Sequence, residues 1–156
     1  MPKKKSGYEL GGATDIGVRE ENQDAIGDLT LEDGTLFVVV CDGMGGHAGG
    51  STASSLAVDA AKSAFSAARP EGVRTALEKA LTSANDVVFQ KSLAQSELKG
   101  MGTTGVAIAI ENNVAFVAHV GDSRAYRIRP RSVEQLTREH TNVQRLVDNV
   151  DNLVYR

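Results

Sequence analysis

The chain contains no tryptophan, and aromatic residues make up only 4% of its 156 residues. Proteins that bind single-stranded nucleic acid stack the bases on aromatic side chains, so this composition argues against that function. The formal net charge is −3, from 17 basic and 20 acidic residues. Such a balance favours neither a nucleic-acid groove nor a membrane-binding face. We therefore expect neither nucleic acid nor a membrane among the partners.

Cysteine is nearly absent as well, because Cys41 is the single one in the sequence. An intrachain disulfide framework is thereby excluded, and a reducing compartment is expected. No apolar run approaches the roughly 20 residues that a membrane-spanning helix needs. The lysines of residues 3–5 are not followed by the apolar region of a signal peptide. We expect residues 1–6 to form a basic disordered tail, residues 7–156 to form one domain, and the protein to be cytoplasmic.

The most informative stretch is the apolar run 36–41, which ends at Asp42 and is followed by five glycines within eight residues. Such a run predicts a strand buried on both faces, with a carboxylate held at its tip. The glycines allow backbone carbonyls and amides to approach a ligand closely. This arrangement suits a hard cation or a phosphate. The alternative is a hairpin turn at Asp42-Gly43, but a helical pattern follows instead of a second strand.

The remaining pattern is a mixture of apolar strands and two amphipathic helices. Strands are expected at 8–14, weakly, and at 25–31, 35–41, 105–110, 114–120 and 124–128, with turns at 32–34 and 111–113. Helices are expected from Ser51 onward, over 73–88 and over 137–148. The first helix carries a stripe of small residues for close packing: Ala53, Leu56, Ala57, Ala60 and Ala64. The pattern predicts an α+β fold, a sandwich of antiparallel β-sheets flanked by helices.

Three loops could bring charged side chains to one end of this sheet. They carry Arg19 with Asp24, Asp42 with Gly43, and Asp122. Clustered carboxylates repel one another unless a cation neutralises them, and ligands that are all oxygen select magnesium or manganese. An arginine beside them could hold a phosphate through two parallel hydrogen bonds. Taken singly, each loop has an ordinary explanation as an Asx-turn, a hairpin or a surface ion pair.

Five motifs in order give the chain a more specific resemblance. They are Arg19 with Asn22-Gln23-Asp24, the segment 40–47, Met101-Gly102-Thr103-Thr104, the segment 119–126 and the segment 136–141. Over residues 7–147 the chain resembles the metal-dependent serine/threonine protein phosphatases of type 2C, in their bacterial form. The resemblance implies two antiparallel sheets flanked by helices. It also implies hydrolysis of phosphoserine and phosphothreonine in proteins that a serine/threonine kinase has phosphorylated.

The resemblance further implies two Mn²⁺ or Mg²⁺ ions that bridge the attacking water, and a third, weaker site. Carried over residue by residue, Asp42 bridges both ions and Gly43 offers its carbonyl oxygen to one of them. Asp24 holds a metal-bound water, and Asp122 helps to hold the third ion. The substrate phosphate is bound by Arg19. Together, Arg19 and Asp42 would carry the catalysis.

Two departures from the family pattern affect the site. Some relatives place a histidine directly after the Asp-Gly pair as a candidate general acid, whereas this chain has Met44 there and His47 later. For His47 the alternative is a hydrogen bond that orders the loop. Family domains also continue for roughly eighty to a hundred residues more, with further metal-binding aspartates. Asp148 and Asp151 are either a shortened form of that terminal motif or turn residues.

Three alternative functions follow from the same residues. A domain lacking the C-terminal metal ligands could be a catalytically impaired phosphoprotein-binding or regulatory module. The segment 43–48 also fits the G-x-G-x-x-A pattern of dinucleotide-binding enzymes. That pattern requires a parallel strand about 20 residues later, where this sequence is helical. A Walker phosphate loop is excluded because no Gly-Lys-Ser/Thr follows.

Overall fold

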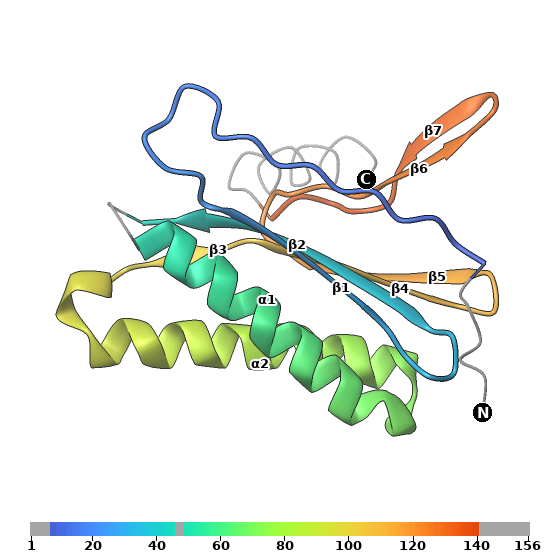
Figure 1. Ribbon diagram of the computed structural model, residues 1–156, viewed down its shortest axis with the longest axis horizontal. Helices are drawn as coiled ribbons and strands as arrows, with labels where there is room; N and C mark the ends of the chain where they lie inside the picture. Colours follow the sequence, from blue (N-terminus) through green and yellow to red (C-terminus); the bar gives the residue numbers. More distant parts are fainter. Residues whose placement is uncertain (1–6, 46–48, 141–156) are drawn as a thin grey trace, which may run out of the picture.

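The computed structural model describes residues 7–45 and 49–140. Its main feature is a five-stranded antiparallel sheet with two long helices on one face (Figure 1). The sheet has the order β1-β2-β4-β5, with the short β3 paired to the end of β2. Its strands are β1 (Asp24–Thr30), β2 (Leu36–Met44), β3 (Gly102–Thr103), β4 (Gly105–Glu111) and β5 (Val114–Val120). The expected α+β class is confirmed.

The other elements connect or extend this sheet. They are helices α1 (Gly49–Ala68) and α2 (Val73–Ala94), the 3-10 turns η1 (Arg69–Glu71) and η2 (Ser96–Leu98), and the separate hairpin of β6 (Tyr126–Arg129) and β7 (Ser132–Gln135). Neither long helix in this part of the chain is apolar enough to cross a membrane. Several of the sequence predictions concern residues that the structure does not describe. They are the expected tail 1–6, the expected helix beyond residue 140, and the candidate residues His47, Asp148 and Asp151.

The β1–β2 hairpin confirms the turn expected at 32–34. Gly34 has a φ of 85°, which favours glycine, and its N–H donates to the Leu31 carbonyl at 3.0 Å. The Leu31 N–H in turn donates to the Thr35 carbonyl at 2.9 Å. This turn fixes the register in which Thr30 lies opposite Leu36 and, six residues further along, Asp24 lies opposite Asp42. The turn at one end of the hairpin therefore sets the pairing of the two aspartates at the other.

The hydrophobic core lies between the helices and one face of the sheet. Phe37 of β2 stacks on Phe65 of α1 with 4.3 Å between ring centroids, and both side chains are fully buried. Helix α1 approaches β1 closely, since a Cβ on Gly27 would lie 2.4 Å from the Val58 side chain. The buried face of α1 is displaced from the expected stripe. Its members are Ala53, Ser54, Ala57, Val58, Ala61, Phe65 and Ala68, whereas Ala60 and Ala64 are only half-buried.

The opposite face of the sheet is largely open in the described part of the chain. The prediction that the 36–41 strand is buried on both faces is wrong there, because Val40 is 42% exposed and its register partner Ile26 is 43% exposed. Both helices lie on the other face. The N-terminal segment crosses this side, where a Cβ on its Gly12 would lie 3.9 Å from the Ile26 side chain, and the β6–β7 hairpin lies on the same side (Figure 1).

Three smaller expectations also differ from the structure. Residues 8–14 form no strand, although the Tyr8 hydroxyl donates to Asn113 Oδ1 at 3.0 Å and accepts from the Asn113 N–H at 3.1 Å. Residues 137–140 are not helical. The strand expected at 124–128 begins at Tyr126, and its partner β7 was not foreseen. All eight strand residues of the hairpin are exposed, and β7 lacks the apolar alternation that β6 shows at Tyr126 and Ile128.

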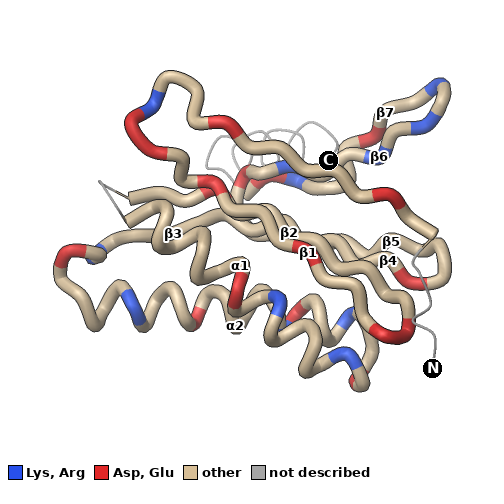
Figure 2. Tube along the Cα trace, viewed as in Figure 1, with Lys and Arg blue, Asp and Glu red and all other residues tan. Residues whose placement is uncertain are grey.

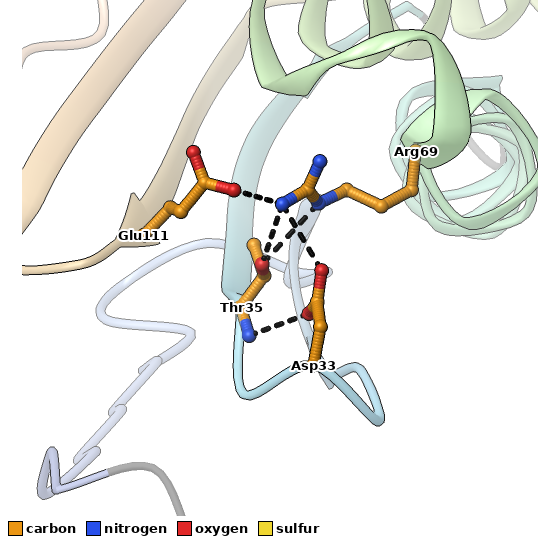
Figure 3. A network of polar contacts seen from close by, with 4 residues as sticks. All are labelled: Asp33, Thr35, Arg69 and Glu111. Atoms are coloured by element: carbon orange, nitrogen blue, oxygen red, sulfur yellow. Dashed lines mark hydrogen bonds and ion pairs between the residues drawn. The ribbon is translucent and has the colours of Figure 1, made fainter.

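A polar network stabilises the end of the sheet that is remote from Asp24 and Asp42 (Figure 3). The Arg69 guanidinium pairs with Asp33 at 3.0 Å and with Glu111, and it donates twice to the Thr35 hydroxyl at 3.2 Å. Burial acts to raise the pKa of Asp33, but hydrogen bonds from Thr35 and the charge of Arg69 outweigh it and lower that pKa. One side chain thus ties η1 to the β1–β2 turn and to β4.

Replacing Arg69 with methionine is expected to lower the free energy of unfolding by about 2 kcal/mol, because charge-assisted hydrogen bonds are lost and two carboxylates lose their partner. Urea unfolding would measure the change. The matched control is Lys79→Met, which removes an exposed ion pair to Glu71 and should cost less than about 0.5 kcal/mol. Equal effects of the two substitutions would contradict a structural role for the network.

Candidate metal and phosphate site

Asp24 and Asp42 face each other directly across the β1–β2 ladder. Side chains that are opposite in an antiparallel pair have Cβ atoms about 5 Å apart, and like charges at such positions repel. The pKa of Asp42 is raised, first by burial and then by the negative charge of Asp24. Arg19 acts in the opposite direction, and Asp122 adds to the increase. The structure therefore brings together four residues that the sequence placed in three separate loops.

The loop that carries Arg19 and Asp24 is shaped by its own side chains. Gly17 adopts a φ of 60°, and its N–H donates to Asp15 Oδ1 at 2.7 Å. The Asn22 side chain accepts from the Asp24 N–H at 3.0 Å and donates to the Thr14 hydroxyl at 2.8 Å. Asn22 thus fixes the start of β1, where Asp24 must lie to face Asp42.

Gly43 sits where no other residue fits. Its N–H donates to the Gln23 carbonyl at 2.9 Å. A Cβ at this position would lie 2.0 Å from the Gly50 carbonyl oxygen at the start of α1, and 2.8 Å from the Gln23 carbonyl oxygen. A Cβ on Gly50 would in turn overlap the Gln23 side chain at 2.3 Å. The two glycines therefore let the end of β2 approach the first turn of α1 to backbone contact.

Thr104 joins the Asp42 loop to the Asp122 loop, a role that the sequence did not reveal. Its hydroxyl accepts from the Asp42 N–H at 3.0 Å and shares a hydrogen bond of 2.7 Å with the Ser123 hydroxyl. Its backbone N–H donates to the Asp42 carbonyl at 2.9 Å. Gly121 has a φ of 95° and packs on the Thr104 side chain, where a Cβ would lie 2.8 Å from a methyl group. The only signal in the sequence was the Thr103-Thr104 motif itself.

Two histidines support the same loop from β5 and from the segment after β7. The His119 and His140 rings stack with 4.6 Å between centroids. The backbone N–H of His140 donates to the Gly121 carbonyl at 2.9 Å, and Nδ1 of the His140 ring accepts from the Gly121 N–H at 3.4 Å. Burial, followed by the charge of His140, lowers the pKa of His119. Sequence reasoning assigned neither histidine a role.

A folded protein with this histidine pair is expected to lose stability as the pH falls. The folded-state pKa of His119 lies below the ordinary value of 6.5, so the unfolded chain binds the proton more readily. The stability that neutral His119 contributes to the fold is complete above pH 6.5. It is lost as the pH drops from there toward the folded-state pKa of His119. Urea unfolding of the wild type and of His119→Phe between pH 7.5 and 5 tests this. Parallel pH profiles for the two proteins would contradict it.

The oxygen atoms of Asp24, Asp42 and Gly43 suit a hard divalent cation in their chemistry, although not in their number. Two carboxylates and the Gly43 carbonyl are the oxygen ligands that magnesium and manganese prefer. Within residues 7–45 and 49–140, however, no three Asp, Glu, His or Cys side chains converge closely enough to hold an ion. Asp122 therefore influences Asp42 through its charge without completing a cluster. The described residues therefore offer some of the ligands that such a site would need, but not a complete set.

Cys41 takes no part in this chemistry. Its side chain is 2% exposed and faces the helices, and burial raises the pKa of its thiol to about 11. A thiol with such a pKa is protonated at neutral pH and behaves as a small hydrophobic group.

Figure 2 shows that Lys and Arg positions are dispersed over the helices, the N-terminal loop and the β6–β7 hairpin in the part of the chain that the structure describes.

Comparison with known proteins relates this arrangement to a family. The model of the family Protein phosphatase 2C matches residues 11–148. Serine/threonine phosphatase stp of Listeria monocytogenes serotype 4b is 37% identical over 139 residues, which are 86% of this chain and 55% of that protein. The structure of Stp1 from Staphylococcus aureus has a TM-score of 0.80 at 35% identity, covering 92% of this chain and 60% of that one.

A further solved structure holds metal ions. The catalytic domain of serine threonine protein phosphatase PstP, in complex with two manganese ions, has a TM-score of 0.72 at 33% identity. The match covers 85% of this chain and 56% of that one. The chain therefore belongs to the protein phosphatase 2C family, as its motifs suggested. It spans about half the length of the curated relative stp.

Proposed function

We propose that this chain provides the phosphate-binding and primary metal-binding part of a metal-dependent serine/threonine protein phosphatase. The observation that supports this most is the Asp24–Asp42 pair, because burial and then the negative charge of Asp24 raise the pKa of Asp42, while the positive charge of Arg19 acts to lower it. A cation between the two carboxylates would remove their repulsion. The family match and the manganese-bound relative agree with this function.

The residues have distinct roles in the proposed reaction. Two bound Mn²⁺ or Mg²⁺ ions would supply a water of lowered pKa and neutralise charge on the phosphate oxygens. Asp42 and the Gly43 carbonyl would hold the ions, and Asp24 would orient a metal-bound water. Asp122 would contribute to a third, weaker site. Arg19 would bind the phosphate oxygens through parallel hydrogen bonds and hold the phosphorus in line with the attacking water.

The substrates proposed are phosphoserine and phosphothreonine residues of proteins that a serine/threonine kinase has modified, in the cytoplasm. Residues 7–156 would form one domain that corresponds to the N-terminal part of the family domain. The two acids and one carbonyl of the β1–β2 end fall short of a complete two-ion centre. We therefore expect the C-terminal section that the family carries to supply further carboxylates.

Hydrolysis of para-nitrophenyl phosphate by the 156-residue chain, with manganese titrated from none to excess, tests this function. Activity is expected to rise with manganese. Arg19→Ala should lower kcat/KM at least about tenfold, mainly through KM, because phosphate binding is lost while metal binding is kept. The control is Arg131→Ala, which changes an exposed arginine between β6 and β7 and should leave the activity unchanged.

Two results would contradict the proposal. One is hydrolysis that does not depend on manganese, or the absence of manganese binding by a folded chain. The other is a loss of manganese affinity in Arg19→Ala as large as its loss of activity, because Arg19 would then support the metal site and not the phosphate. Isothermal titration with manganese measures that affinity directly.

A further inference from the structure

A cleft lies between the helices and the sheet, on the opposite side of β2 from the aspartate pair. It encloses about 210 Å³. Its lining comes from the ends of β2 and β5, from α1 and α2, and from the segment 101–105. The floor is formed by Val39 and Cys41, and the small side chains of Ala57, Ala61 and Ala84 leave the space between the layers open.

The chemistry of the walls limits what could bind. The mouth carries three exposed apolar side chains, Met44, Phe89 and Val120, with exposed fractions of 57%, 55% and 48%. Among the residues that the structure describes, the lining contains no Asp, Glu, Lys, Arg or His. Asn85 adds one amide at the mouth. An occupant would therefore be neutral and apolar, with one hydrogen-bonding group for Asn85.

The size of the cleft favours a small molecule. An apolar cavity of about 150 Å³ is large enough for benzene, so 210 Å³ admits one or two fused rings. A helix or a strand of a partner protein would not enter it, because a helix alone is about 10 Å across. The flexible Met44 and Met101 side chains can adapt to different ring shapes.

The cleft is mechanically linked to the candidate metal site. Cys41 and Asp42 are consecutive on β2, so their side chains point to opposite faces of the strand. Gly43 pairs with Thr103 and Met44 pairs with Gly102, and all but Gly43 line the cleft. Thr104 also lines the cleft, and its hydroxyl accepts a hydrogen bond from the Asp42 N–H. An occupant would therefore press on the same short ladder that positions Asp42 and the Gly43 carbonyl.

We propose that this helix–sheet cleft is a binding site for a compact neutral aromatic molecule with one ring or two fused rings, and that its occupation changes the metal affinity of the Asp24–Asp42 pair. The binding stands without the proposed phosphatase function, whereas the coupling rests on it. Linkage requires that metal binding changes the affinity for the occupant by the same factor.

Methionine methyl NMR with indole as the probe tests the binding. The sequence has three methionines, and Met44 and Met101 among them line the cleft. Indole titrated into the ¹³C-methyl-methionine-labelled full chain should shift the Met44 and Met101 signals saturably and leave Met1 unchanged. No shift, or shifts that rise linearly without saturation, would overturn the site.

Two variants locate the binding. Ala84→Leu fills the cleft and should abolish the saturable shifts. Because it could also disturb the core, Phe89→Ser serves as a second variant at the exposed mouth and should weaken indole binding at least about fivefold. Leu93→Ser, one helical turn further and outside the lining, is the matched control with unchanged affinity. Equal weakening by Phe89→Ser and Leu93→Ser would overturn the assignment.

The coupling is measured by manganese titration calorimetry with and without saturating indole. At least a threefold change in the manganese Kd is expected, with an equal change in the indole Kd when manganese is saturating. An unchanged manganese Kd overturns the coupling alone. Absence of any manganese binding overturns the coupling and the proposed function, while the indole shifts still decide the cleft.

Discussion

Replacing Gly43 with alanine is expected to lower the free energy of unfolding by about 3 kcal/mol or more. The added methyl group would lie 2.0 Å from the Gly50 carbonyl oxygen and 2.8 Å from that of Gln23. Both are backbone atoms, so no side-chain rotation can make room, and overpacking of this kind is costly. The end of β2 would separate from the first turn of α1. Urea unfolding without metal measures the loss.

Gly102→Ala is the matched control for this substitution. Gly102 lies in the same β2–β3 ladder, opposite Met44, but a Cβ there would meet only the Met44 side chain at 3.6 Å or more. That distance is ordinary van der Waals contact, so the expected change is within about 0.5 kcal/mol. A Gly43→Ala protein as stable as the control would show that the backbone approach between β2 and α1 is not tight.

Replacing Asp42 with asparagine is expected to separate stability from metal binding. Without metal the variant should be more stable than the wild type by about 0.5 kcal/mol, because the repulsion by Asp24 is removed. The stabilisation by manganese, about 2.7 kcal/mol for the wild type at a hundred times its Kd, should be lost. Hydrolysis should fall at least about a hundredfold, since in the proposed function this carboxylate would hold both ions. Thermal unfolding with and without manganese measures the first two effects.

Asp28→Asn provides the comparison. Asp28 is exposed on the same face of β1, but it lies opposite Val38 and not opposite a carboxylate. Its removal should change neither the manganese response nor the activity. If Asp42→Asn kept the manganese response of the wild type, the paired aspartates would not be the metal site.

The same aspartate should make metal binding sensitive to acid. A carboxylate must be deprotonated to bind a cation, and the pKa of Asp42 is raised by burial and by Asp24. As the pH is lowered, manganese affinity should therefore begin to fall at a higher pH than it would if Asp42 had the ordinary pKa of an aspartate. The metal-free fold has the opposite dependence through this group, because the folded chain binds that proton more tightly than the unfolded chain.

The sequence was most informative where local pattern and chemistry coincide. The apolar run predicted a carboxylate close to a strand end, although β2 continues two residues past Asp42 to Met44. The 32–34 turn determined the β1–β2 register that brings Asp24 opposite Asp42. Both features follow from neighbouring residues. The convergence of Arg19 and Asp122 on the same place was an inference from chemistry, and the electrostatics of Asp42 agree with it.

Features that depend on distant contacts were not predictable. The hydroxyl of Thr104 joins two loops only because β3 and β4 bring it beside Asp42 and Ser123, which lie 62 and 19 residues away in sequence. The open face of β2 is another case, because an apolar run cannot show whether a second layer covers it. β7 lacked any apolar alternation that would have marked it.

The proposed function depends above all on binding of a divalent cation at the Asp24–Asp42 pair. Paramagnetic broadening of ¹H–¹⁵N amide signals by substoichiometric manganese, recorded on the ¹⁵N-labelled 156-residue chain, tests it most directly. The signals of Asp24, Asp42 and Gly43 are expected to broaden first, and this selectivity should disappear in Asp42→Asn. Broadening centred on another part of the chain, or the same selectivity in Asp42→Asn, would contradict it.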